Sequence, residues 1–162
     1  MEWPRASDAT MTTGPIEVRA ATLDDAAAIA ELLRQLGYPN TRDEVRGRLG
    51  AMDTDAGDRA FVACAGEAVL GFAAVHLIPM IHHDGCVARI TAFVVTESAR
   101  GRGIGTALFA ACEAYGAARA AERLEVTSGD QRTGAHAFYI RRGCAREGQR
   151  LTKRLDDRRR RL

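Results

Sequence analysis

Arg100-Gly101-Arg102-Gly103-Ile104-Gly105-Thr106 is the stretch that decides how this 162-residue chain folds. An apolar, strand-like run over residues 90–95 enters it, and a helix-like run over residues 104–119 leaves it. Glycines permit a sharp turn and a close approach by a ligand. The first turn of the helix leaves N–H groups without intrahelical partners at the positive end of the helix dipole. With two arginines alongside, the stretch predicts a binding site for phosphate oxygens between a strand and a helix.

The glycines do not fit the two commonest nucleotide-binding motifs. A P-loop requires a lysine directly after the glycines, and Lys153 is the only lysine in the chain. The dinucleotide fingerprint requires a third glycine, where this sequence has Thr106. From these residues alone, a glycine-rich loop that binds no ligand remains the alternative.

Two longer segments carry a family resemblance. The segment 94–108 resembles the acyl-CoA loop of the GCN5-related N-acetyltransferases (GNAT), whose pattern is Gln/Arg-x-x-Gly-x-Gly/Ala after a hydrophobic strand. The segment 135–144 is similar to that family's Ala-x-x-Phe-Tyr-x-x-x-Gly-Phe pattern, with Cys144 in the place of the final Phe. The two motifs follow one another in the family's order, and the resemblance covers residues 16–155.

The resemblance implies an α/β fold of the GNAT acyl-CoA N-acyltransferase type. Its central mixed sheet is mostly antiparallel, with one splayed parallel strand pair and helices on both faces. We expect a single such domain over residues 15–156, a disordered leader over 1–14 and an arginine-rich tail over 157–162. The chain length agrees with one domain.

Hydrophobic spacing predicts the individual elements. Alternating and apolar runs indicate strands over 16–20, 60–65, 68–77, 86–95, 123–127 and 149–155. Helical spacing indicates helices over 23–36, 41–50, 104–119 and 132–142. Cys112 falls on the core-facing side of the third helix, which favours a small core residue over a nucleophile. Tyr38, between the first two helices, either lines the family's acceptor site or packs at a helix end.

Composition narrows the class of protein. The hydrophobic share of 46% and the charged share of 27% are typical of soluble globular proteins. A net charge of +2 argues neither for nor against nucleic acid as a partner. We do not expect nucleic acid as a partner, although a tail with four consecutive arginines keeps that reading open. No apolar run is long enough to span a membrane. Four scattered cysteines without a Cys-x-x-Cys motif indicate reduced thiols and a cytoplasmic location.

The loop over residues 78–85 contains His82, His83 and Asp84. Adjacent side chains rarely converge on one metal ion without outside ligands, and no further His or Cys stands at a suitable spacing. We therefore expect no metal site.

The resemblance implies acetyl-CoA as co-substrate and assigns residues to it. The backbone at the end of the strand is expected to hold the pantetheine arm and to polarise the thioester carbonyl, and the glycine loop to bind the diphosphate. Arg132 stands where many relatives have an Asn, and it is expected to reach a phosphate. The full set of expected acetyl-CoA contacts is Phe93, Val94, Val95, Arg100, Gly101, Arg102, Gly103, Ile104, Gly105, Thr106 and Arg132.

Tyr139 is the expected catalytic residue, because it matches the family Tyr that protonates the leaving thiolate. The alternative is that Phe138 and Tyr139 form an aromatic pair that only packs the helix. The general base stays unassigned. Many relatives carry a Glu in the strand before the glycine loop, and residues 90–93 contain no carboxylate. The remaining candidates are Glu125, His76, His82, His83 and a water chain.

Three functions follow from these patterns. The first is an N-acetyltransferase that moves an acetyl group from acetyl-CoA to a primary amine of a small molecule or protein. The second is a non-catalytic acyl-CoA-binding sensor, which the missing strand carboxylate favours. The third and weakest is a nucleic-acid-associated protein that uses the arginine-rich tail. The resemblance also makes a homodimer an expectation, whereas the acceptor amine stays open.

Overall fold

The computed structural model describes residues 14–52, 54–82, 84–148 and 150–153. The chain divides into two compact units, Met1–Thr127 and Ser128–Leu162. Apart from Gly14, the expected leader lies outside the described residues, and so does the whole arginine-rich tail.

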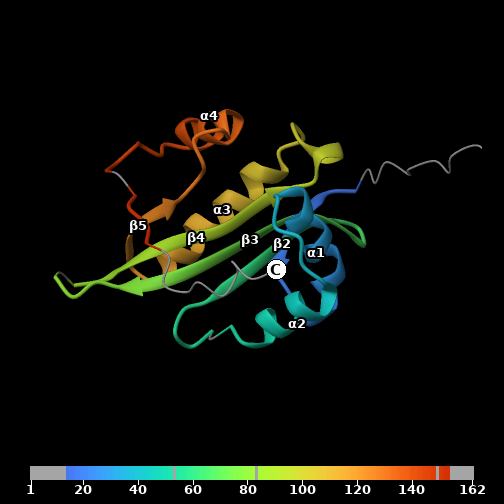
Figure 1. Cartoon of the computed structure of the whole chain (residues 1–162), viewed down its shortest axis with the longest axis horizontal. Helices are drawn as coiled ribbons and strands as arrows, with labels where there is room; N and C mark the ends of the chain where they lie inside the picture. The colour runs from blue at the N-terminus through green and yellow to red at the C-terminus, as the bar shows by residue number, and fades with distance from the viewer. Residues whose placement is uncertain (1–13, 53, 83, 149, 154–162) are drawn as a thin grey trace, which may run out of the picture. The chain divides into compact units, whose positions relative to one another are not determined.

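The first unit is built on one mixed sheet (Figure 1). Its strands are β1 (Ile16–Ala20), β2 (Arg59–Ala65), β3 (Ala68–Pro79), β4 (Cys86–Val95) and β5 (Ala121–Val126). They lie in the order β1-β2-β3-β4-β5, and the first four pair antiparallel whereas β5 runs parallel to β4. The helices of this unit are α1 (Ala26–Gln35), α2 (Arg42–Gly50) and α3 (Ile104–Ala118), with 3-10 turns η1 (Leu23–Asp25) and η2 (Glu97–Ala99). The predicted mixed sheet with one parallel strand pair is confirmed.

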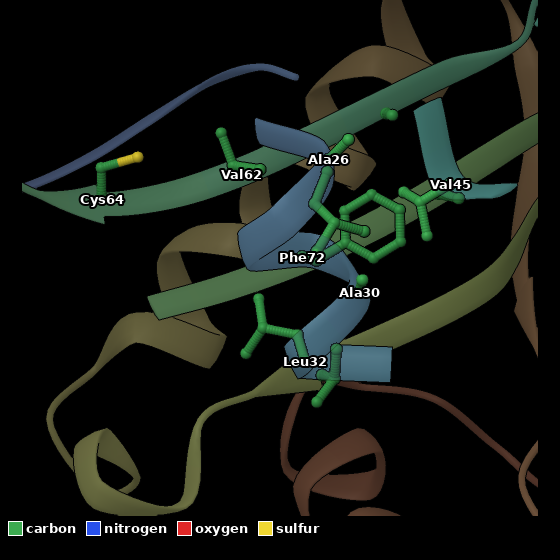
Figure 2. Close-up of a cluster of buried hydrophobic side chains, with 11 residues drawn as sticks. Ala26, Ala30, Leu32, Val45, Val62, Cys64 and Phe72 are labelled. Carbon is green, nitrogen blue, oxygen red and sulfur yellow. The ribbon is translucent and has the colours of Figure 1, made fainter. Parts of the chain in front are cut away.

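Helices α1 and α2 cover one face of the sheet. Residues alternate between the two faces of a strand, and the row that contains Val62 and Phe72 meets these helices. Figure 2 shows Phe72 surrounded by side chains from α1 and α2. The buried members of this cluster are Ala26, Ile29, Ala30, Leu32, Val45, Ala60, Val62, Cys64, Phe72, Ala74 and Val94.

Helix α3 covers the opposite face. Phe93 of β4 meets Phe109 edge-on at 6.1 Å between ring centroids, and Phe61 of β2 meets Tyr115 at 5.9 Å. A Cβ added at Gly116 would lie 3.1 Å from the Cβ of Ala88, so the helix approaches β4 closely there. Cys112 is buried as predicted, together with Ile104 and Leu108. Phe109 is buried as well, because a helix that lies across several strands contacts them with more than one row of side chains.

Local capping fixes where the first two helices begin. Thr41 accepts a hydrogen bond from the backbone N–H of Glu44 and donates its own N–H to that carboxylate, which forms a capping box at α2. Before α1, the Asp25 carboxylate accepts hydrogen bonds from the Thr22 N–H at 2.7 Å and from Arg19 at 2.8 Å. The first turn after Thr22 is therefore a 3-10 turn held by an ion pair, rather than the start of the predicted α-helix.

Replacing Asp25 by Asn should lower the free energy of unfolding by about 1–2 kcal/mol at neutral pH, since Asp25 is buried while Arg19 stays partly exposed. The Arg19 hydrogen bond holds the pKa of Asp25 at about 2, below its ordinary value of 3.8. A carboxyl with a lowered folded-state pKa stabilises the fold above its unfolded pKa and loses that effect as the pH falls through the folded value. Urea unfolding should therefore show the difference from the native protein fading between about pH 4 and about pH 2.

The matched control for this prediction is Glu31→Gln. Glu31 pairs with Arg34 on the exposed side of α1, where solvent screens the pair. We expect no measurable change in unfolding. Equal destabilisation by both substitutions would contradict the role given to the Asp25 ion pair.

Several element boundaries differ from the predicted ones. Strand β3 continues to Pro79 because it pairs with β4 down to Cys86. Strand β5 begins at Ala121, directly after Ala120 turns the chain with a positive φ of 54°. The predicted strand over 149–155 is wrong where it is described, since residues 150–153 form no strand and Leu151 is 90% exposed. Alternation gave that segment a strand-like pattern, but a strand needs a neighbour to pair with.

The second unit contains helix α4 (Thr133–Arg141). Arg132 is its N-cap, and Gly143 ends it with a φ of 89°. The helix is thus one residue shorter at each end than predicted. In the described part of both units, we find no helix that combines the length and the apolarity needed to cross a membrane.

Candidate active site

The glycine loop opens helix α3 in the manner that the sequence predicts. Gly101 and Gly103 have φ values of 77° and 80°, in the left-handed region that side chains disfavour. A Cβ built at either position would meet no atom of the described residues within 4 Å, so the space beside the backbone is open.

Gly103 is the N-cap of α3, and its carbonyl accepts the first helical hydrogen bond, from the N–H of Ala107 at 3.0 Å. The N–H groups of residues 104–106 therefore have no intrahelical acceptor. They point out of the first turn, where the helix dipole favours an anion.

The end of strand β4 projects past its parallel neighbour. Strand β5 pairs with β4 from Cys86 to Ile90, whereas β3 pairs with β4 as far as Val95. Within the described residues, positions 91–95 thus have a ladder partner on one side only. The register between β3 and β4 also shifts by one residue, which leaves Thr91 as an extra residue between Ile90 and Ala92. Strand β4 thus extends past the end of β5, at the place where the family resemblance implies a splay.

The side chains at this end of β4 are occupied elsewhere. Phe93 packs against Phe109 on the α3 face, and Val94 is 4% exposed in the cluster beneath α1. Any contact of these residues with a ligand must therefore be made by the backbone. Arg100 folds back and donates from Nε to the carbonyl of Val95 at 3.2 Å, which ties the glycine loop to the strand end.

Arg132 and Tyr139 belong to the second unit, at the N-cap and in the last turn of α4. The ring of Tyr139 lies edge-on to that of Phe138 at 5.4 Å, and Tyr139 is 8% exposed. Its backbone carbonyl accepts the N–H of Cys144 at 3.0 Å. The aromatic pair fits the packing role, so the acid role of Tyr139 remains a prediction.

Glu125 is engaged as an ion-pair partner. Arg89 on β4 donates to its Oε2 at 2.6 Å, and Arg123 donates to its Oε1 at 2.8 Å. The hydrogen bond from Arg89, followed by that from Arg123, lowers the pKa of this carboxyl. A carboxylate held in this way is a weaker proton acceptor, which argues against Glu125 as the general base.

His76 is placed differently. Its Nδ1 lies 2.7 Å from Oδ1 of Asp58, and the side chains are 35% and 26% exposed. Of the other two histidine candidates, His82 lies exposed in the turn after β3, and His83 lies outside the described residues.

Neither Asp58 nor Arg89 was singled out from the sequence. Asp58 is 18 residues from His76, and Arg89 is 36 residues from Glu125. Only the strand register brings these pairs together, so no local motif reveals them.

The structure also bears on metal binding and on Cys112 as a nucleophile. Among the described residues, no group of three or more His, Cys, Asp or Glu side chains is arranged to hold a metal ion. Cys112 is fully buried, and desolvation raises the pKa of its thiol to about 12. Such a thiol is inert as a nucleophile.

Tyr38 is 61% exposed at the junction of α1 and α2, which argues against the packing role for its ring.

Comparison with known proteins extends these observations. The family model described as the acetyltransferase (GNAT) family matches residues 26–144. A curated relative from Salmonella typhimurium, named aminoalkylphosphonate N-acetyltransferase, is 33% identical over 144 residues, which cover 86% of this chain and 91% of the relative.

Solved structures share the fold at lower identity. A putative acetyltransferase from Agrobacterium tumefaciens matches with a TM-score of 0.77 and 23% identity, covering 85% of this chain and 99% of that one. Glucosamine-6-phosphate N-acetyltransferase from Arabidopsis thaliana matches with a TM-score of 0.75 and 16% identity, covering 88% of this chain and 100% of that one. Together with the glycine loop and the splayed strand, the family match shows that this chain belongs to the GNAT family of acetyltransferases.

Proposed function

We propose that this protein transfers the acetyl group of acetyl-CoA to the primary amine of a small molecule, by direct attack and with Tyr139 as general acid. The observation that carries the proposal is the positive-φ glycine loop, which opens the N-terminus of α3 beside the end of β4 that extends past β5. The loop suits a diphosphate, and the strand end suits an extended amide-containing arm.

In this mechanism the backbone performs most of the binding. The N–H groups of residues 104–106 hold the diphosphate, with charge added by Arg100, Arg102 and Arg132. Backbone groups of β4 beyond its pairing with β5 hold the pantetheine arm, and one N–H of this strand polarises the thioester carbonyl. The amine attacks the carbonyl carbon, the C–S bond breaks, and the sulfur takes the proton of the Tyr139 hydroxyl.

The acceptor class follows from the curated relative. Its name describes an enzyme that acetylates aminoalkylphosphonates, and it aligns with most of this chain. We therefore place small amines that carry a phosphonate ahead of protein amino groups. We place the reaction in the cytoplasm, where reduced cysteines such as the buried Cys64 and Cys112 persist.

A non-catalytic acyl-CoA sensor is the second candidate. The lack of an available carboxylate base favours it, since β4 contains no Asp or Glu and Glu125 accepts hydrogen bonds from two arginines. Such a protein would bind acetyl-CoA without consuming it.

A thiol-release assay separates the two functions. With acetyl-CoA and a panel of amines, we expect steady release of CoA, at least about tenfold faster with 2-aminoethylphosphonate than with ethylamine, since a charge-assisted contact to the anion adds more than 1.4 kcal/mol. A peptide with a free N-terminus serves as the protein-type acceptor. Binding of acetyl-CoA without release for any amine would favour the sensor, and equal rates with both small amines would remove the phosphonate from the proposal.

A further inference from the structure

His76 lies at the point where β4 and β5 part. It is directly opposite Arg89 in the register of β3 and β4, and Ile90, the next residue of β4, is the last one paired with β5. His76 also stands two residues beyond Ala74, which belongs to the cluster beneath α1 and α2. Since alternate residues of a strand share a face, His76 extends from the sheet face that these helices cover.

The contact with Asp58 sets the proton on the imidazole. Asp58 immediately precedes β2, and its Oδ1 lies 2.7 Å from Nδ1 of His76. A carboxylate only accepts hydrogen bonds, so the neutral imidazole carries its proton on Nδ1 and a lone pair on Nε2. Within the part of the chain that the structure describes, Nε2 has no hydrogen-bond partner, and the side chain is 35% exposed. The ring is thus oriented by a carboxylate at one nitrogen and able to accept a proton at the other.

The nearby charged groups on β4 and β5 pair with one another. Arg89, opposite His76 on β4, directs its guanidinium to Glu125 on β5, and Arg123 donates to the same carboxylate. Both arginines thus bind the Glu125 carboxylate, whereas His76 combines an orienting carboxylate with an unoccupied basic nitrogen.

We propose that His76, oriented by Asp58, is the general base of the acetyl transfer; this inference rests on the proposed function. As the amine nitrogen forms its bond to the carbonyl carbon, the carbonyl π pair moves onto oxygen and an N–H proton passes to Nε2 of His76. The oxyanion then collapses, and the C–S electron pair leaves with sulfur, which takes the Tyr139 proton. Solvent afterwards removes the proton from His76 and returns one to Tyr139.

The spacing of residues along β3 sets how far His76 lies from the end of β4 that extends past β5. Ala74 lies opposite Ala92, in the part of β4 that extends past β5, and His76 follows two residues later on the same face. At about 3.3 Å per residue the separation along β3 is about 7 Å. The proposed proton transfer therefore runs through the His76 side chain and one bridging water.

The test measures kcat at neutral pH for the full-length protein, with acetyl-CoA and the best amine of the panel. His76→Ala should lower kcat about 100-fold at neutral pH, the contribution typical of a placed base. Added imidazole should restore at least about tenfold of that loss, since it replaces the missing group.

Asp58→Asn is the second variant, and it removes a charge while keeping the shape. It should lower kcat, because an amide can donate as well as accept a hydrogen bond and therefore no longer fixes the proton of His76 on Nδ1. His82→Ala is the matched control, an exposed histidine in the neighbouring turn, and it should keep the native kcat without any imidazole effect. Thermal unfolding of each variant checks that the fold is retained.

The outcomes are distinct. A His76→Ala variant with native kcat would overturn the inference, and so would a slow variant that imidazole does not restore while Asp58→Asn keeps the native kcat. Native protein that turns over no amine would instead remove the proposed function, and the base assignment with it. Native turnover combined with an unaltered His76→Ala variant would remove only the base assignment.

Discussion

Replacing Gly103 and Gly105 together by Asp should weaken acetyl-CoA binding at least about 100-fold. Gly103 has a φ of 80°, and Gly105 lies in the first turn of α3. Each Asp places a negative charge where the open N–H groups and the helix dipole favour an anion, and the two repulsions act on the same diphosphate. Side chains at these positions also fill the space through which the diphosphate approaches the backbone. Calorimetric titration of native and variant protein with acetyl-CoA measures the effect directly.

The control must reproduce the charge and the backbone strain without touching the loop. Gly37→Asp combined with Gly47→Asp does so, because Gly37 has a φ of 96° and Gly47 lies on the exposed side of α2, and an added Cβ meets no described atom at either position. This control should bind acetyl-CoA with an affinity within about threefold of the native protein. If both double variants bind as the native protein does, the glycine loop is structural and the diphosphate lies elsewhere. If a folded native protein shows no binding, the proposed function and the sensor function fail together.

Replacing Tyr139 by Phe should lower kcat about 100-fold and leave the dissociation constant of acetyl-CoA within about twofold of the native value. The substitution removes one hydroxyl and keeps the ring, so the edge-on contact with Phe138 persists. A proton donor acts mainly on the transition state, in which the thiolate leaves, and contributes little to ground-state binding. Steady-state thiol release and calorimetric titration report the two quantities separately.

Tyr115→Phe is the matched control for this prediction. The Tyr115 hydroxyl donates to the carbonyl of Gly57 at 3.0 Å, a structural contact between α3 and the chain before β2. Its loss should cost about 1 kcal/mol of unfolding free energy and leave kcat unchanged. Should Tyr139→Phe retain native kcat, Tyr139 serves to pack α4, and the thiolate is protonated by solvent or by another group.

The competing functions differ in what they require of the same residues. A transferase requires a group that accepts the amine proton and a group that supplies one to sulfur, whereas a sensor requires only the glycine loop and the strand end. The missing carboxylate in β4 is therefore the central question for this chain. The His76–Asp58 pair is our proposed base, and it lies level with the point where the pairing of β4 with β5 ends.

Much of the fold was predictable from local patterns. Strand β4 and the start of α3 at Ile104 have the predicted bounds, because a continuous apolar run, three glycines and a helical apolar stripe each constrain the backbone over a few residues. Boundaries that depend on a partner were predicted less well. Strand β5 begins where it meets Cys86 of β4, and the alternation around Leu151 produced no strand because a pattern does not provide a neighbour.

The sequence by itself determined the glycine turn before α3, since positive φ and open helix N–H groups are local consequences of glycine placement. It also determined the family, because two motifs in order are specific to it. Only the tertiary structure decided which polar side chains meet. Arg89 pairs with Glu125, 36 residues away in sequence, and Asp58 pairs with His76, 18 residues away. The register of four strands brings both pairs together. Register is set by the packing of whole sheet faces, so a shift of one residue would turn each of these side chains to the opposite face.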